Sequence, residues 1–289
     1  MSFELYCNTS FKISDLVTKC YSTSFSLAMK TFSREMRENI SSVYGFVRIA
    51  DEIVDSFHDF DKKYLLDEFR KETEKAFCNG ISVNPVLHSF QITAKKYNIP
   101  YKYINDFIDS MEMDLTNSCY DRDKYDKYVY GSAEVVGLMC LKVFCNNDDE
   151  LFQKMIEPAK ALGSAFQKVN FLRDIGSDLS ERKRIYLPGA TSVNDIDNNN
   201  KVLLEKEIEE EFRIALSGIK MLPKSCASGV YSAFLYYYIL FNKIKRIKAK
   251  DLLRERVRIS NLTKLSLLVK SVIEINFPEI SGFQNKKFS

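Results

Sequence analysis

Two pairs of aspartates are the residues of this chain whose type and spacing most directly indicate chemistry. The first pair is Asp51 and Asp55, and the second is Asp174 and Asp178. Side chains four residues apart share one face of a helix, so each pair would place two carboxylates side by side. Like charges at this spacing repel by roughly 0.2–0.5 kcal/mol on an exposed helix, and by more when they are buried. One such pair is most simply a solvated acidic surface, so the surrounding residues decide the interpretation.

Each pair ends a narrow polar stripe on an otherwise apolar helix. At about 100° per residue, Gln167, Asn170 and the second pair fall within an arc of about 80°. Tyr44, Arg48 and the first pair fall within about 60°. The opposite faces are apolar, with Leu162, Ala165, Phe166, Val169 and Leu172 on one helix and Phe46, Ile49, Ala50 and Ile53 on the other. Two stripes of the same construction indicate one shared site.

Aspartate pairs without histidine or cysteine are typical of Mg²⁺, which prefers oxygen ligands and is often bridged by substrate phosphates. Two facing pairs could hold a cluster of Mg²⁺ ions, and the ions could hold a diphosphate. A diphosphate on an allylic carbon leaves readily once its charge is neutralised, and an allyl cation remains. That cation needs a dry cavity with aromatic faces. Residues 231–241, YSAFLYYYILF, concentrate aromatic side chains, although aromatics at helical spacing more often pack a core.

The stripes must be positioned by helices, and the sequence predicts helix almost throughout. Gly and Pro are scarce, with 10 and 6 residues among 289, and apolar residues recur at spacings of three and four. No segment alternates with the period of two that a strand requires. We expect an all-α bundle that forms a single domain over residues 1–289. The predicted helices lie near 11–29, 34–57, 62–78, 85–97, 101–116, 124–144, 148–178, 201–219, 224–248 and 252–275.

Composition limits the classes of function. The net charge of +3 is too small to indicate a nucleic-acid-binding protein. Seven scattered cysteines lack the spacing of a zinc site and fit a reducing cytosol. The first residues do not resemble a signal peptide, and no window approaches the 18 or so uninterrupted apolar residues of a membrane span. We therefore expect a soluble, cytoplasmic protein.

Six short segments spread over nearly the whole chain carry these residues and others with polar chemistry. They are YSTSFS (21–26), YGFVRIADEIVD (44–55), YVYGSAEVVG (128–137), QKVNFLRDIGSD (167–178), RIYLP (184–188) and RERVRIS (254–260). In this order they resemble the squalene and phytoene synthase family, the head-to-head trans-prenyltransferases. The resemblance implies an all-α isoprenoid synthase bundle around a central cavity. It also implies that two prenyl diphosphates are joined, first into a cyclopropyl diphosphate and then into a 1-1′ linked product.

Matched position by position, the family's motifs imply a role for individual residues. Ligands of Mg²⁺, or of Mn²⁺ in its place, would be Asp51, Asp55, Asn170, Asp174 and Asp178. Diphosphate contacts would come from Ser22, Ser24, Arg48, Gln167, Asn170, Arg173, Arg184 and Arg256. Tyrosines near the reacting carbons would be Tyr44, Tyr128, Tyr186 and Tyr237. The aspartates, with Tyr44, Tyr128 and Tyr186, are the predicted catalytic set.

Two positions depart from the family pattern, since Glu134 and Lys183 stand where many relatives have glycine. The segments GFVRIADEIVDSF and GSAFQKVNFLRD are nevertheless most similar to bacterial members that make phytoene from two geranylgeranyl diphosphates, in carotenoid biosynthesis. A dehydrosqualene or squalene synthase acting on farnesyl diphosphate is the alternative, and a squalene synthase would also need NADPH. A terpene cyclase and a non-catalytic helical assembly factor are further alternatives.

The segment KIKRIKAKDLLRERVR, residues 243–258, carries eight Lys or Arg residues. Its simplest interpretation is a solvated helix end and turn. The functional alternative is contact with an anionic membrane, which would place the protein peripherally at the inner face of the membrane and assist product release. Prenyl diphosphates are the expected partners, nucleic acid is not, and the sequence leaves the oligomeric state open.

Overall fold

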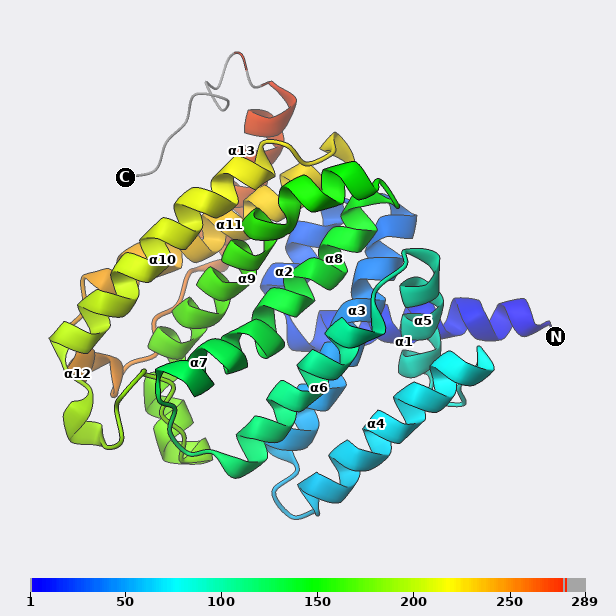
Figure 1. Cartoon of the computed structure of the whole chain (residues 1–289). Coiled ribbons are helices and arrows are strands. Elements are labelled where there is room, and N and C mark those ends of the chain that lie inside the picture. The colour runs from blue at the N-terminus through cyan, green and yellow to red at the C-terminus, as the bar shows by residue number, and fades with distance from the viewer. Residues whose placement is uncertain (1, 278, 280–289) are drawn as a thin grey trace.

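The computed structural model describes residues 2–277 and residue 279, and it confirms the all-α prediction (Figure 1). Within those residues there is no β-strand, and the one β-type contact is an isolated bridge between Cys119 and Ile185. The α-helices are α1 (Phe3–Tyr21), α2 (Thr23–Ala28), α3 (Arg34–Ser56), α4 (Lys62–Asn79), α5 (Pro85–Lys96), α6 (Tyr101–Thr116), α7 (Arg122–Val129), α8 (Val135–Cys145), α9 (Asp149–Ser177), α10 (Asn198–Ile219), α11 (Lys224–Lys245), α12 (Ala249–Leu252) and α13 (Asn261–Asn276).

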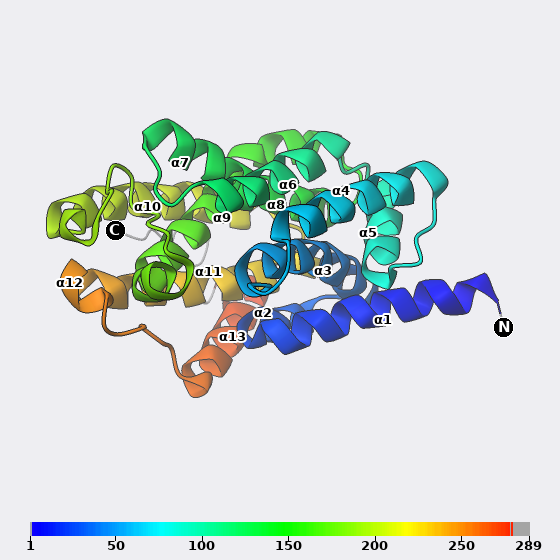
Figure 2. The ribbon, with the colours of Figure 1, turned by 90° about the horizontal axis from the view of Figure 1, so that it is seen from below.

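The two helices that carry the polar stripes are α3 and α9, and each packs against a different set of neighbours. Helix α9 contacts α8, α10 and α11, whereas α3 contacts α1, α5, α6 and α8. Figure 2 shows α1 and α13 along one side of the molecule and α6 and α7 along the opposite side. Helix α8 therefore touches both stripe-bearing helices and links the two halves of the bundle.

Helix α9 has 29 residues and is the longest in the protein's described part. Its N-cap is Asp148, whose carboxylate accepts a hydrogen bond from the Leu151 amide. The negative charges of Asp149 and Glu150, in the first turn, interact favourably with the helix dipole. Pro158 lies inside the helix, and a Cβ atom added to Gly218 of α10 would lie 2.3 Å from the Pro158 Cβ atom. Glycine at 218 therefore allows α10 to pass close to α9.

Three predicted helices are interrupted in the structure. The helix predicted near 11–29 breaks at Ser22, whose hydroxyl accepts from the Phe25 amide and caps α2. The helix predicted near 124–144 contains a π-helical segment, Tyr130–Glu134. The predicted start of the helix near 252–275 is wrong. Helix α12 ends at Leu252, and α13 begins only after its N-cap, Ser260. These interruptions lie within or next to the motifs of the site.

One stretch, Arg122–Cys145, is long and apolar enough to span a membrane by length and composition alone. More than half of its most apolar window, 56%, is buried within the protein. Core helices pass the same test, and this stretch comprises α7, the π-helical segment and α8, which packs on both α3 and α9.

Candidate active site

The α3 stripe is organised by one arginine. Arg48 donates to Asp51 at 2.6 Å and to Glu52 at 2.8 Å, and its guanidinium carbon lies 4.4 Å from the centre of the Tyr21 ring. Burial and the neighbouring Asp55 carboxylate raise the pKa of Asp51. The α3 stripe therefore holds more negative charge than Arg48 alone offsets.

The α9 stripe is organised by two arginines at Asp174. Arg173 donates to Asp174 at 2.5 Å, and Arg256, from the segment before α13, donates at 2.7 Å. Burial opposes ionisation, but these two guanidinium groups lower the pKa of Asp174. Asp178 differs, because burial, together with the Asp174 charge, raises its pKa to about 7 although Arg182 acts in the opposite direction.

Two further arginines join the α3 wall to the end of α9. Arg182 donates to Asp55 at 3.1 Å and to Asp178 at 2.6 Å, so it lies between the two stripes. Arg184 donates to Asp55 at 2.8 Å. Arg182 therefore links one aspartate of each stripe, Asp55 and Asp178. Asp51 and Asp174 pair with other arginines.

Tyr128 and Tyr186 lie in a buried cluster behind this network. Their hydroxyls each donate to the Asp114 carboxylate at 2.7 Å, and Tyr120 donates to it at 2.8 Å. The rings of Tyr128, Tyr186 and Phe171 pack together, with Phe171 and Tyr186 stacked at 4.5 Å. Among the described residues, neither of these tyrosines lines the cavity of about 850 Å³ that lies between α3 and α9. Their placement near reacting carbons stays a prediction.

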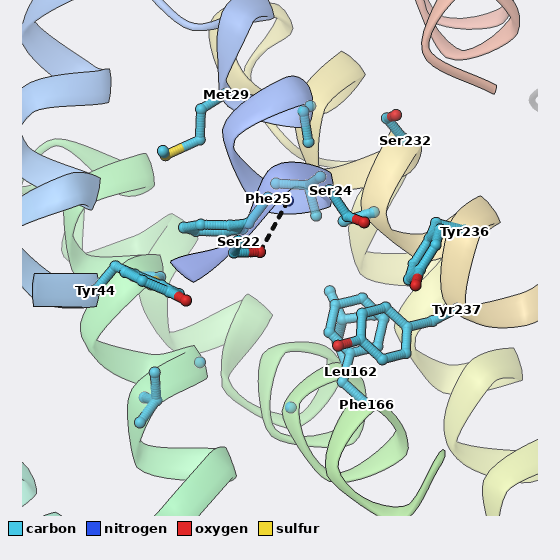
Figure 3. A pocket seen from close by; sticks show the side chains of 18 of the residues that line it. Ser22, Ser24, Phe25, Met29, Tyr44, Leu162, Phe166, Ser232, Tyr236 and Tyr237 are labelled. Atoms are coloured by element: carbon cyan, nitrogen blue, oxygen red, sulfur yellow. Dashed lines mark hydrogen bonds between the residues drawn. The ribbon is translucent and has the colours of Figure 1, made fainter. Parts of the chain in front are cut away.

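A cavity of about 850 Å³ lies between α3 and α9. The predicted residues that line it are Ser22, Ser24, Tyr44, Arg48, Gln167, Asn170, Arg173, Tyr237 and Arg256. Figure 3 shows Ser22, Phe25 and Tyr44 across the cavity from Phe166 and Tyr237. The structure thus gathers nine predicted residues around one space, eight of them from four of the six motifs and the ninth, Tyr237, from α11.

Aromatic rings form the cavity wall beside the polar residues. Phe25 stacks on Tyr44 with ring centres 5.2 Å apart, and Phe166 stacks on Tyr237 at 3.9 Å. Burial raises the pKa of Tyr44 to about 12, so its hydroxyl stays protonated at neutral pH. Tyr236 and Tyr237 both line the cavity, whereas Tyr238 packs against Phe212.

The other end of the cavity is apolar. Its lining there includes Phe32, Phe144, Met155, Ile219 and Leu222. The cavity follows α9 from Arg173 to Met155, a span of 18 residues, or about 27 Å at 1.5 Å per residue. A long ligand with a charged head and an apolar tail fits such a shape.

In the part of the chain that the structure describes, no group of three or more His, Cys, Asp and Glu side chains is close enough to hold a metal ion. Arginines lie among the predicted ligands instead. The donor set nevertheless fits Mg²⁺: it is oxygen-only, Asn170 Oδ1 is buried without a hydrogen-bond partner, and the pKa values of Asp51 and Asp178 are raised. A buried carboxylate with a raised pKa indicates negative charge that a cation would stabilise.

Sequence reasoning missed three residues of this network, Glu52, Asp114 and Arg182. Asp114 had a detectable signal, because it continues the buried stripe of Ile104, Phe107 and Met111 at spacings of three and four. A carboxylate on an apolar helix face is unusual, and this marks Asp114 as a candidate functional residue. Glu52 and Arg182 follow charged partners by four residues, a spacing common on any helix.

Residues 18–263 match the squalene/phytoene synthase family, a span that contains both aspartate stripes and most of the cavity lining. The chain belongs to this family. Its members are head-to-head prenyltransferases, so the protein is a transferase of isoprenoid biosynthesis. The family assignment inferred from the six motifs is confirmed.

Relatives of this synthase include a phytoene synthase and a 4,4′-diapophytoene synthase. It is 27% identical to the phytoene synthase of Arthrospira platensis over 285 residues, which covers 90% of this chain and 91% of that protein. It is 28% identical to the 4,4′-diapophytoene synthase of Staphylococcus haemolyticus over 236 residues, covering 80% of this chain and 79% of that protein.

Solved structures share the fold of this synthase. A dehydrosqualene synthase in complex with ligand has a TM-score of 0.79 at 22% identity, covering 95% of this chain and 99% of that chain. The squalene synthase HpnC from Alicyclobacillus acidocaldarius has a TM-score of 0.73 at 24% identity, covering 84% of this chain and 95% of that chain. The predicted isoprenoid synthase bundle is therefore confirmed as the fold.

Proposed function

We propose that the protein is a phytoene synthase, which condenses two geranylgeranyl diphosphates head to head through cyclopropyl prephytoene diphosphate. The observation that carries this proposal is the cavity, which has arginines and serines at one end and an apolar lining that follows about 27 Å of α9. Similarity to the phytoene synthase of Arthrospira platensis over nine-tenths of the chain supports the twenty-carbon substrate.

The polar end of the cavity would bind the diphosphates. Arg48, Arg173 and Arg256 all line it, and each guanidinium can donate two parallel hydrogen bonds to phosphate oxygens. Ser22 and Ser24 line the cavity from the start of α2. These five side chains would orient the substrates so that the first carbons of both prenyl chains meet at one place.

Asp51, Asp55, Asn170, Asp174 and Asp178 would hold Mg²⁺, with Mn²⁺ as the alternative. When bound, the metal neutralises charge that develops on a departing diphosphate. The arginines that now pair with these carboxylates would then be available to phosphate oxygens, because a cation replaces them at the aspartates. The raised pKa values of Asp51 and Asp178 support a cation at these two carboxylates.

The aromatic wall would stabilise the carbocations. One substrate loses diphosphate, and the double bond of the other captures the allyl cation, losing a proton as the cyclopropane closes. The cyclopropyl diphosphate then loses its own diphosphate, rearranges, and releases a proton to give the 1-1′ linked hydrocarbon. The Tyr44, Phe25, Phe166 and Tyr237 rings border the cavity, and a cation over such a ring gains about 0.5–2 kcal/mol.

The second candidate is a thirty-carbon synthase that uses farnesyl diphosphate. The similarity to the 4,4′-diapophytoene synthase of Staphylococcus haemolyticus favours it. The two candidates differ only in how much of the apolar end the tails occupy. NADPH enters only if the product is squalene.

Competition between the two substrates tests the assignment. Purified protein with Mg²⁺ receives equal concentrations of geranylgeranyl and farnesyl diphosphate, with and without NADPH, and the hydrocarbons are separated by mass. We expect the forty-carbon product to predominate and NADPH to change nothing. Predominance of a thirty-carbon product would assign the second candidate instead.

A further inference from the structure

Asp114 is a buried carboxylate that the metal and diphosphate sites do not use. Its side chain is 3% exposed, and it lies in the last turn of α6. Burying a charge costs several kcal/mol, and a negative charge is disfavoured at the C-terminal end of a helix. A residue placed against both preferences needs strong compensating contacts.

Four donors surround the Asp114 carboxylate. Tyr120 and Tyr186 donate to its Oδ1 atom at 2.8 and 2.7 Å, and Tyr128 donates to its Oδ2 atom at 2.7 Å. The Arg184 Nη1 atom lies 3.5 Å from Oδ2. Burial raises the pKa of Asp114, whereas the Arg184 charge and the three tyrosine hydroxyls favour the ionised carboxylate and act in the opposite direction.

Arg184 is shared between this cluster and the aspartate stripe of α3. Its Nη1 atom donates to Asp55 Oδ1 at 2.8 Å and to the Tyr186 hydroxyl at 3.2 Å, and its Nη2 atom donates to the Val54 carbonyl at 3.2 Å. The side chain is 8% exposed, so water screens these charges weakly. One guanidinium therefore lies between two carboxylates, one on α3 and one on α6.

We propose that Asp114 is a positioning residue, whose charge shares Arg184 between α6 and α3 and so limits how fully Arg184, beside Arg182, neutralises Asp55. Asp55 then keeps more negative charge for a divalent cation. If the charge of Asp114 were removed, Arg184 would pair with Asp55 alone and compete more strongly with the cation. This inference rests on the proposed function, because it takes Asp55 as a metal ligand.

Metal affinity in the absence of prenyl substrate tests the inference. Wild-type protein and Asp114→Asn are titrated with Mn²⁺ in buffer without diphosphate, and free Mn²⁺ is measured from its electron paramagnetic resonance signal. Asn keeps the size of the side chain and one acceptor oxygen but removes the charge. We expect the apparent Kd for Mn²⁺ to rise at least fivefold in Asp114→Asn.

Tyr120→Phe is the matched control. It removes one hydrogen bond from the same carboxylate but leaves the charge of Asp114 and its contact with Arg184. A structural role would give both variants similar thermal midpoints and similar Mn²⁺ affinities. We expect only Asp114→Asn to lose Mn²⁺ affinity, with Tyr120→Phe within twofold of the wild type.

A double substitution covers the case in which Asp114→Asn does not fold. Asp114→Asn with Arg184→Gln removes both charges together and leaves neither buried unpaired. If Asp114 acts through Arg184, the double variant binds Mn²⁺ within twofold of Arg184→Gln alone. A threefold or larger difference between these two, or an unchanged Kd in a folded Asp114→Asn, overturns the inference. Wild-type protein that binds no Mn²⁺ would overturn the proposed metal site as well.

Discussion

On α3, Asp51 faces one arginine, Arg48, which is shared with Glu52. On α9, Asp174 lies between two arginines, Arg173 and Arg256, and its pKa is lowered, whereas that of Asp51 is raised. The two aspartate stripes match in sequence, but their first aspartates differ in charge balance. Asp51 has negative charge that a cation would stabilise, whereas Asp174 is already neutralised by the protein's own arginines.

Neutralising either stripe should have the largest effect on activity. Asp51→Asn and Asp174→Asn each remove a proposed metal ligand, and metal stabilisation of the leaving group contributes several kcal/mol. We expect product formation to fall at least about 10³-fold in both, since each 1.4 kcal/mol is tenfold in rate. Steady-state assays with Mg²⁺ measure this. Activity within tenfold of the wild type in either variant would remove that aspartate from the site.

The same two substitutions should differ in their effect on the thermal stability of the metal-free protein. Without Mg²⁺, Asp174→Asn leaves Arg173 and Arg256 without their shared carboxylate, whereas Asp51→Asn removes repulsion with Asp55. A lost hydrogen bond to a charged group costs about 1.5–3 kcal/mol. We expect a lower thermal midpoint for Asp174→Asn, by several degrees, and an unchanged or higher one for Asp51→Asn. Equal decreases in metal-free calorimetry would contradict the comparison.

The pH dependence of stability gives a smaller effect with a defined sign. Asp178 titrates near 3.8 when unfolded and near 7 when folded, so the folded state binds the extra proton between these values. Its contribution favours folding below about pH 4 and is lost as the pH rises to about 7. We expect the metal-free midpoint of wild-type protein to fall more between pH 5 and 7 than that of Asp178→Asn, which lacks this carboxyl group. Parallel profiles would contradict the raised pKa.

Substitution of Lys183 should give the smallest effect, a small change in the free energy of unfolding. Lys183 has a φ of +57°, in the left-handed region, at the residue that follows the π-helical end of α9. A non-glycine residue there costs about 1–2 kcal/mol, partly offset by the greater freedom of unfolded glycine. We expect Lys183→Gly to stabilise the protein by about 0.5–1 kcal/mol in denaturant titrations. The corresponding end of α3, at Phe57, has a negative φ of −86° and offers no such gain.

Helical periodicity was sufficient to predict the fold and the two stripes, because both depend on spacing within one helix. The resemblance of the six motifs to a family, and not periodicity, placed Ser22 in the same predicted site as Tyr44, Arg48 and Asn170. Asp114 could not be assigned a role in this way, since its partners Tyr120, Tyr128, Tyr186 and Arg184 come from segments up to 72 residues away. Lys183 has a left-handed φ that favours glycine, the residue expected at this position from the family resemblance.

The arginine pairs were equally inaccessible from sequence. Arg182 and Arg184 reach Asp55 only because the chain turns back after α9, at a left-handed residue and a bridge between Ile185 and Cys119. Spacing cannot indicate which of several nearby arginines meets a given carboxylate.

The mass of the product from geranylgeranyl diphosphate alone tests the central claim most directly. Purified protein is incubated with this diphosphate and Mg²⁺, without NADPH, and the extracted hydrocarbon is analysed by mass spectrometry. The account predicts a forty-carbon hydrocarbon with the mass of phytoene and none in the absence of divalent cation. A parallel incubation with farnesyl diphosphate supplies the comparison. A thirty-carbon hydrocarbon from that incubation, with no forty-carbon product from geranylgeranyl diphosphate, would contradict the account.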